Sequence, residues 1–184
     1  NRLGLDNEPW WGDQTSIGEP GFKVTYHCVA HRYYLSHRLW VNHPDLLFFR
    51  EDYGLTLAEA RVWASVVALT GGIVKLGESY LDMHDHPEWR AVVEQLLPVH
   101  PATARPLDMF ERHFPELWHL PIERGAQAWQ VVGLFNWGMN RDISASLMEE
   151  EQERTFEHSL SRFGLDPGAR VLAFDAWEHT WRWI

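Results

Sequence analysis

The sequence predicts a mixed α/β protein, with a parallel sheet in its first part and antiparallel strands in its second. In residues 1–98, two short apolar runs alternate with helical patterns, an order typical of a parallel sheet, either a barrel or a doubly wound one. After Pro98, Pro101 and Pro106, apolar side chains instead recur at every second position, as in antiparallel strands with one covered face. We therefore divide the chain into residues 1–98 and 99–184.

The first elements follow a polar opening. Residues 1–20 are rich in Gly, Pro, Asp and Trp and have no helical period, so we expect the end of a strand and a long loop. Apolar side chains then recur at helical spacing over residues 22–36, which predicts a helix. A short, β-compatible apolar run follows over residues 38–42. Pro44 ends it, because proline lacks the amide hydrogen that a central strand needs.

A capping box marks the start of the second helix. Thr56 supplies a hydroxyl for the first amides, and Glu59 supplies a carboxylate three residues later. The helix is predicted to run to about Leu69, because Gly71-Gly72 break it. Paired glycines also permit a close approach of the backbone, either to a ligand or to a neighbouring element.

One more strand and one more helix complete the first part. The strand is predicted over residues 72–77, where the side chains are mainly apolar. The helix is predicted over residues 87–97, with Pro87 in its first turn and Pro98 after its end.

Alternating apolar residues predict strands over residues 129–137, 156–160, 171–177 and 180–184. Asp166-Pro167-Gly168 predicts a turn between the second and third of these strands. We therefore expect an antiparallel, β-sandwich-like domain over residues 99–184, with its last strands beyond this sequence.

Composition and charge exclude several classes of function. The net charge of −10 opposes binding to the phosphates of nucleic acid. No apolar run approaches the length of a membrane span, so we expect no membrane partner. A single cysteine, Cys28, rules out an intrachain disulfide and leaves the compartment open between cytoplasmic and secreted. The 11 tryptophans suit either an aromatic core or stacking against the C–H faces of sugars.

Two segments combine residues that could carry chemistry. Asp6 is followed by Trp10 and Trp11 and preceded by Arg2; apolar walls can keep a carboxyl protonated near neutral pH, as a general acid requires. The alternative is a polar loop anchored by two tryptophans. Asn42-His43-Pro44-Asp45 would place polar groups at the carboxyl end of a parallel strand, where barrels carry active sites, or would simply form a turn.

Two histidine pairs could bind a metal, but neither has a third ligand at a telling spacing. His27 and His31 are four residues apart on a predicted helix, and His84 and His86 flank Asp85. We expect neither a metal site nor a cofactor.

Together these segments resemble the melibiase-like α-galactosidases of glycoside hydrolase family 36, and more weakly family 27. The family patterns fall in order along nearly the whole chain, with His43 at a position where the family usually has aspartate. The matching residues are Arg2-Leu3-Gly4-Leu5-Asp6 with Pro9, Trp10 and Trp11; Asn42-His43-Pro44-Asp45 with Arg50; Leu55-Thr56 and Glu59-Ala60-Arg61; Ala68-Leu69-Thr70-Gly71-Gly72; Phe135-Asn136-Trp137; Gly164-Leu165; and Phe174-Asp175 with Trp177.

The resemblance implies that residues 1–98 are the last third of a (β/α)₈ TIM barrel, followed by the β domain. It implies a retaining hydrolase of terminal α-galactosides or α-N-acetylgalactosaminides, which works by double displacement between two carboxylates. Asp6 matches the acid/base, and the nucleophile would lie on an earlier strand, before Asn1. Arg2, Trp10, Trp11, Asn42 and Asp45 are the implied sugar-binding residues. The implied partners are the α-galactoside and the rest of the same barrel; the alternative is a carbohydrate-binding fragment without activity.

Overall fold

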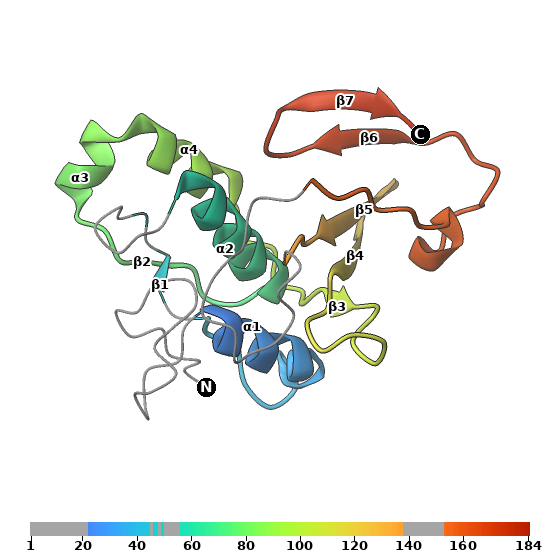
Figure 1. Ribbon diagram of the computed structural model, residues 1–184, viewed down its shortest axis with the longest axis horizontal. Helices are drawn as coiled ribbons and strands as arrows, with labels where there is room; N and C mark the ends of the chain where they lie inside the picture. The colour runs from blue at the N-terminus through green and yellow to red at the C-terminus, as the bar shows by residue number, and fades with distance from the viewer. Residues whose placement is uncertain (1–21, 45, 48, 50–55, 138–152) are drawn as a thin grey trace.

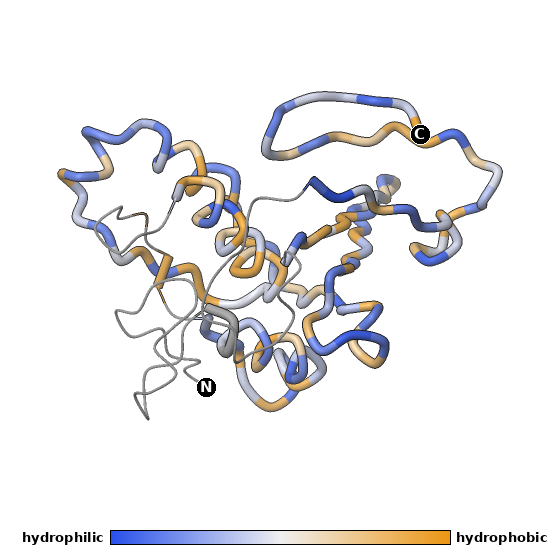
Figure 2. The backbone as a smooth tube through the Cα atoms, viewed as in Figure 1, coloured by the Kyte–Doolittle hydropathy of each residue, from blue (hydrophilic) through white to orange (hydrophobic). Residues whose placement is uncertain are grey.

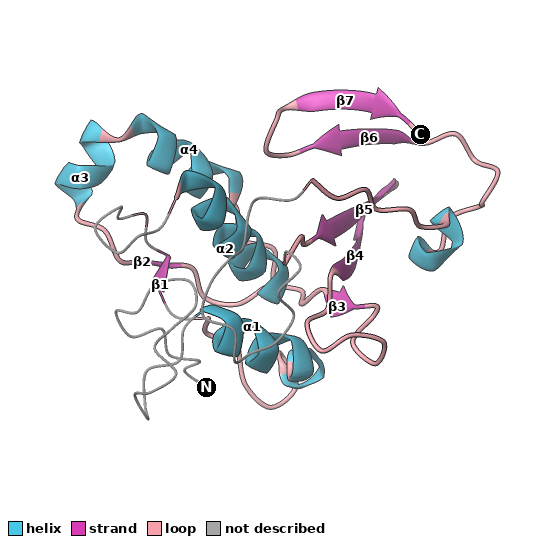
Figure 3. Ribbon diagram, viewed as in Figure 1, coloured by secondary structure: helices cyan, strands magenta, loops and turns pink. Residues whose placement is uncertain are grey.

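A computed structural model describes residues 22–44, 46–47, 49, 56–137 and 153–184 (Figure 1). Over these residues the fold is mixed α/β, with four α-helices, one small parallel sheet, two small antiparallel sheets and no closed barrel (Figure 3). In the same part of the chain, no helix is long and apolar enough to cross a membrane. The predicted α/β class is thus confirmed.

The first helix, α1 (Phe22–His31), is shorter than the predicted 22–36. It buries Tyr26, Val29 and Ala30, whose spacing places them on one face. A short 3₁₀ turn, η1 (Tyr33–Leu35), follows it. The predicted helix thus exists, but its last turn tightens and the chain reverses direction.

Helix α2 (Leu57–Thr70) has the ends that its sequence predicts. The Thr56 hydroxyl accepts the Glu59 amide at 3.3 Å, and the Glu59 carboxylate accepts the Thr56 amide at 2.8 Å. Gly71 ends the helix in the left-handed conformation, with φ of 60°. The helix buries most of one side, including Trp63, whose indole donates to the Leu46 carbonyl at 3.1 Å.

The parallel sheet consists of β1 (Leu46–Leu47) and β2 (Lys75–Leu76), which pair Leu46 with Lys75 and Leu47 with Leu76. The strand predicted over residues 38–42 is therefore wrong: the paired residues come after Pro44. Residues 35–40 instead form a turn in which the Leu39 amide donates to the Leu35 carbonyl, and the Leu39 side chain is 72% exposed. An apolar run in the sequence does not form a strand where nothing covers it.

Two helices follow β2. The prediction missed α3 (Tyr80–Asp85), which begins where the Ser79 hydroxyl accepts the Asp82 amide at 3.1 Å. Helix α4 (Pro87–Gln95) starts with proline at its first position, as predicted. It packs on α2 through Val92 and Val93, which belong to the main core.

The second part begins with the sheet β3–β4–β5, made of β3 (Arg105–Pro106), β4 (Leu117–Arg124) and β5 (Gln127–Leu134). All its neighbouring strands are antiparallel, and β4 and β5 form a hairpin around Gly125, whose φ is 62°. The strand predicted over residues 129–137 is confirmed over residues 129–134, and residues 135–137 lie beyond the end of β5. The prediction missed β4, which contains Pro121.

The rest of the second part forms a separate hairpin, β6 (Leu172–Asp175) with β7 (Thr180–Trp183). Both strands lie where the alternation predicts them, and the Ala169 amide donates to the Asp166 carbonyl in the predicted turn. The strand predicted over residues 156–160 is wrong. Residues 153–159 do not pair with any strand of the described residues. The Ser159 hydroxyl accepts the Ser161 amide, and a short 3₁₀ helix, η3 (Leu160–Phe163), follows.

One continuous group of buried apolar side chains joins the two parts of the chain. Figure 2 shows apolar positions gathered where α2 approaches α1 and the β4–β5 hairpin. At the centre of this contact, the Tyr26 ring lies 4.3 Å from the Trp137 ring and 5.9 Å from the Trp118 ring. The segments before and after residue 98 therefore share a core.

Candidate functional site at the carboxyl end of the parallel strands

The direction of the parallel strands decides which residues share an edge of the sheet. The Ile73 amide donates to the Asn42 carbonyl at 3.3 Å, before the paired residues, and the Gly77 amide donates to the Leu47 carbonyl at 2.8 Å, after them. Asn42 thus lies at the amino end of the pair. The predicted position of Asn42 at the carboxyl end is wrong, because the strand begins after Pro44 instead of ending before it.

Most of the predicted site lies outside the described residues. Arg2, Asp6, Trp10, Trp11 and Asp45 all belong to that group, so their predicted roles stay predictions.

Asn42, the remaining predicted residue, occupies a buried and tightly packed position. Its Oδ1 accepts the Trp40 indole at 3.0 Å, and its amide donates to the Ser36 hydroxyl at 3.3 Å. A Cβ on Gly72 would lie 2.0 Å from the Asn42 carbonyl oxygen, so the glycine pair serves close backbone packing. The side-chain Nδ2 of Asn42 has no hydrogen-bond partner among the described residues. The role of Asn42 in sugar binding stays a prediction.

At the carboxyl end of the pair, Glu78 and Phe49 come together. The Glu78 carboxylate accepts the Phe49 amide at 2.7 Å, which adds a side-chain rung to the ladder beyond Leu47 and Gly77. Since parallel sheets in α/β proteins bind ligands outside their carboxyl ends, this edge is the candidate site.

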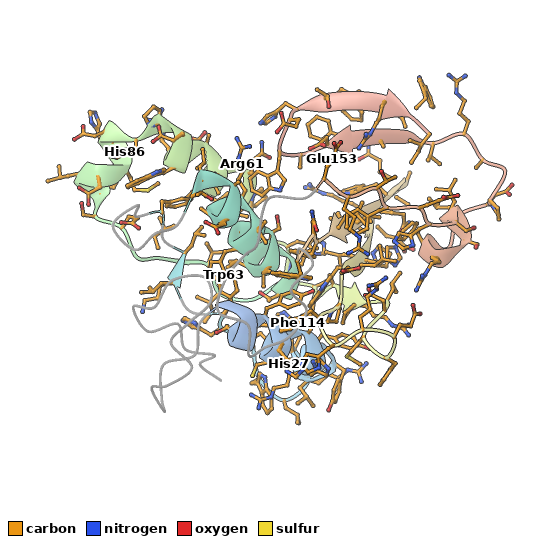
Figure 4. All side chains as sticks on the ribbon, viewed as in Figure 1. His27, Arg61, Trp63, His86, Phe114 and Glu153 are labelled. Carbon is orange, nitrogen blue, oxygen red and sulfur yellow. The ribbon has the colours of Figure 1, made fainter. Side chains whose placement is uncertain are left out.

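An aromatic stack supports this edge from the side of α4. The buried Phe49 ring stacks on Trp89 with centroids 5.7 Å apart. Trp89 in turn stacks at 3.8 Å on His86, which is labelled in Figure 4. His86 Nδ1 lies 2.8 Å from a Glu88 carboxylate oxygen. Hydrogen bonds from its own backbone amide and from His86 lower the pKa of Glu88. The edge thus combines a carboxylate held by a backbone amide with a wall of stacked rings.

The sequence interpretation missed these residues, although one signal pointed to them. Glu78 directly follows the predicted strand 72–77, so its place at the carboxyl end could have been inferred. Phe49 and Trp89 carried no such signal, because their stacking depends on how α4 packs against the strands.

A second group of charges lies beside the β3–β4–β5 sheet. Asp108 and Glu116 are both buried, and Asp108 accepts the amides of Glu116 and Leu117 at 2.9 and 3.1 Å. Arg154 holds Glu116 through both guanidinium nitrogens, and this contact raises the pKa of Arg154. Both carboxylates are thus engaged in structural contacts, Glu116 with arginine and Asp108 with two backbone amides.

The histidine pairs do not converge on a metal position. The His27 and His31 rings stack face to face with centroids 4.0 Å apart, and His84 contacts the Asp85 carboxylate at the surface. Over the part of the chain that the structure describes, no three His, Cys, Asp or Glu side chains are arranged to hold a metal ion.

Neither a scan against models of protein families nor a search of curated proteins finds a match to this chain. Its function must therefore be inferred from the ordered sequence motifs and from the geometry described above.

Proposed function

We propose that this chain is part of a retaining glycoside hydrolase that cleaves terminal α-galactosides or α-N-acetylgalactosaminides, with Asp6 as its acid/base. In this proposal, β1, α2 and β2 belong to a (β/α)₈ barrel whose other strands complete the sheet. The β3–β4–β5 sheet and the β6–β7 hairpin belong to the C-terminal β domain.

The observation that carries the proposal is the parallel β1–α2–β2 unit. Two parallel strands joined by a helix are the repeating unit of a barrel. The family-like motifs follow one another along this unit in the order of the family, although Asn42-His43-Pro44 comes before a strand and not at its end. Asn42-His43-Pro44 precedes β1, Glu59 opens α2 and Gly71-Gly72 lead into β2.

The exposure of β2 also supports additional strands. Ile73 and Leu76 are 47% and 41% exposed, although parallel strands are normally covered on both faces. Further strands beside this pair would remove apolar surface from water, as closure of a barrel does.

The chemistry assigned to Asp6 requires two steps. A carboxylate from an earlier barrel strand attacks the anomeric carbon while the glycosidic bond breaks, and the Asp6 carboxyl gives its proton to the departing oxygen. The Asp6 carboxylate then takes a proton from water as that water attacks the same carbon and releases the first carboxylate. Arg2, Trp10 and Trp11 would line the sugar site.

The test compares leaving groups in the complete enzyme that the proposal requires. For Asp6→Ala, we expect kcat/KM to fall about 10²–10⁴-fold on melibiose, whose leaving group needs a proton, and much less on a nitrophenyl α-galactoside. Asp85→Ala is the matched control, because its exposed side chain contacts the neighbouring His84 at the surface. Equal losses on both substrates, or no loss on either, would remove Asp6 from this role.

A second candidate function, carbohydrate binding without catalysis, is favoured by exposed tryptophans. Trp129, Trp181 and Trp183 are 42%, 65% and 57% exposed, and indole rings stack on sugar faces. Titration of the chain with melibiose, followed by tryptophan fluorescence, separates the two candidates. A saturable signal that Trp181→Ala removes, together with no hydrolysis by the complete enzyme, would favour this second function.

A further inference from the structure

Three imidazole rings meet where α1 packs against the loop between β3 and β4, residues 107–116. The His27 ring lies 4.0 Å from that of His31, one turn later on α1, and 4.7 Å from that of His113 on the loop. Figure 4 shows His27 beside Phe114 at this contact, and the two rings meet edge to face at 6.1 Å. His27 is thus enclosed by two imidazoles and a phenyl ring.

Among the described residues of α1 and the 107–116 loop, every carboxylate already has a partner other than these imidazoles. Every acidic residue of the loop is already bound to arginine: Asp108 to Arg112, Glu116 to Arg112 and Arg154, and Glu111 to Arg162. Arg32, directly after α1, is a cation. Protonation of one ring therefore adds a positive charge next to groups that are neutral or positive.

The same contact anchors α1 to the β domain. Tyr26, the neighbour of His27, donates its hydroxyl proton to the Pro115 carbonyl and accepts the Trp118 indole at 2.6 Å. Burial raises the pKa of Tyr26 well above its ordinary value, so the phenol stays protonated and this link does not titrate in the neutral range. A change in the distance between α1 and the loop must strain these hydrogen bonds.

We propose that the His27–His31–His113 cluster is an acid-sensitive clamp. It holds α1 against the 107–116 loop while the three imidazoles are neutral, and it weakens when protons enter, because like charges at 4–5 Å separation repel one another.

The direction of the pH effect follows from His27. Burial, His31 and His113 lower its pKa from 6.5 to about 4 in the folded protein. Between these two values, the unfolded chain binds a proton that the folded chain rejects, so acid favours unfolding. The contribution of the cluster to stability is complete above pH 6.5 and is lost progressively as the pH falls toward about 4.

The experiment measures urea unfolding of the chain at pH 7.5 and pH 5.5, where few carboxylates titrate. His27 alone should increase the unfolding equilibrium constant by about threefold to tenfold over this change, the lower figure allowing for its partial exposure. His27→Phe keeps a stacked ring that cannot take a proton, so we expect most of this increase to disappear. His84→Gln is the control, because it removes an exposed histidine and should leave the increase intact.

His113→Gln provides a second variant for the same measurement. The His113 side chain is exposed, so the fold should tolerate its substitution. It removes one neighbouring charge and should reduce the pH effect in part, and hydrogen exchange of α1 peptides at pH 5.5 should slow relative to the native chain. If His27→Phe fails to fold, this variant decides the question. An unchanged pH dependence in each variant that folds would overturn the proposal.

Discussion

At the scale of single residues, buried polar side chains link segments that lie far apart in the sequence. Tyr26 on α1 reaches the Pro115 carbonyl and the Trp118 indole, and Arg154 reaches Glu116. Each of these groups would cost free energy if it were buried without its partner. The Glu116 carboxylate thus ties the 153–156 segment to the β3–β4–β5 sheet.

Glu116→Gln tests that dependence. The substitution keeps the shape of the side chain but removes the charge that holds Arg154 and Arg112, so that among the described residues Asp108 alone remains as an acidic neighbour of the two guanidinium groups. Because both arginines are partly exposed, we expect a loss of about 2–3 kcal/mol in the free energy of unfolding, below the about 3–5 kcal/mol of a fully buried pair. Urea denaturation at neutral pH measures it.

Glu94→Gln is the matched control for that measurement. Glu94 faces Arg90 one turn away on the exposed side of α4, at 3.6 Å. Exposed pairs of this kind contribute about 0.3–0.5 kcal/mol. A Glu116 variant as stable as the Glu94 variant would show that the buried charges do not hold the 153–156 segment.

At the scale of elements, the junction between α2 and β2 depends on close backbone contact. Gly71 turns the chain in the left-handed conformation, and Gly72 faces the Asn42 carbonyl so closely that a Cβ would lie 2.0 Å from its oxygen. The Ile73 amide bonds to that same carbonyl. We therefore expect Gly72→Ala to push the two strands apart and to destabilise the protein by about 1–3 kcal/mol.

Thermal or urea unfolding of Gly72→Ala checks this expectation against Gly168→Ala. Gly168 sits in an exposed turn, where a Cβ would meet its nearest neighbour, an oxygen of Asp166, at an ordinary 3.6 Å. The Gly168 variant should be close to native. Equal stability of the two variants would mean that the backbones at Asn42 and Gly72 can separate without cost.

The elements that the sequence predicted well are those with a local signal. Thr56 and Glu59 define the start of α2 by contacts within one turn, and Pro87 opens α4 for the same kind of reason. The sequence did not predict strand β4, which contains a proline, a residue that central strands usually avoid. Its Pro121, however, lies beyond the two residues that β3 pairs, where β4 is an edge.

The misplaced first strand explains why the site was predicted only in part. Residues 38–42 and residues 46–47 are both mainly apolar in the sequence. Residues 46–47 form the strand, and they pack under α2, where the Trp63 indole donates to the Leu46 carbonyl. This shift moves Asn42 to the amino end of the strands. Phe49 and Glu78 replace it at the carboxyl end through a contact that no short pattern in the sequence encodes.

At the scale of the whole molecule, contacts across residue 98 are numerous and of several kinds. The Ala104 amide donates to the Leu69 carbonyl at 2.8 Å, and the Thr103 hydroxyl donates to the Thr70 carbonyl at 2.8 Å. The turn of the β6–β7 hairpin, above the helices in Figure 1, contacts α2 where the Trp177 indole donates to the Ser65 hydroxyl at 3.1 Å. The second part of the chain therefore packs against α2.

These contacts predict that both parts unfold in one transition. Pulsed hydrogen exchange over a series of urea concentrations should give the same midpoint for peptides from α2 and from β4, because the core that contains Trp63 also contains Trp118.

Tyr26→Phe should then lower both midpoints together. The Tyr26 hydroxyl links α1 to β4, and its removal leaves the Trp118 indole N–H without its acceptor. A buried donor without an acceptor lowers the free energy of unfolding by about 1–3 kcal/mol. Tyr34→Phe, at an exposed ring, should change neither midpoint. If β4 keeps its protection at urea concentrations where α2 has lost it, the two parts are independent domains, and the shared core contributes little to either.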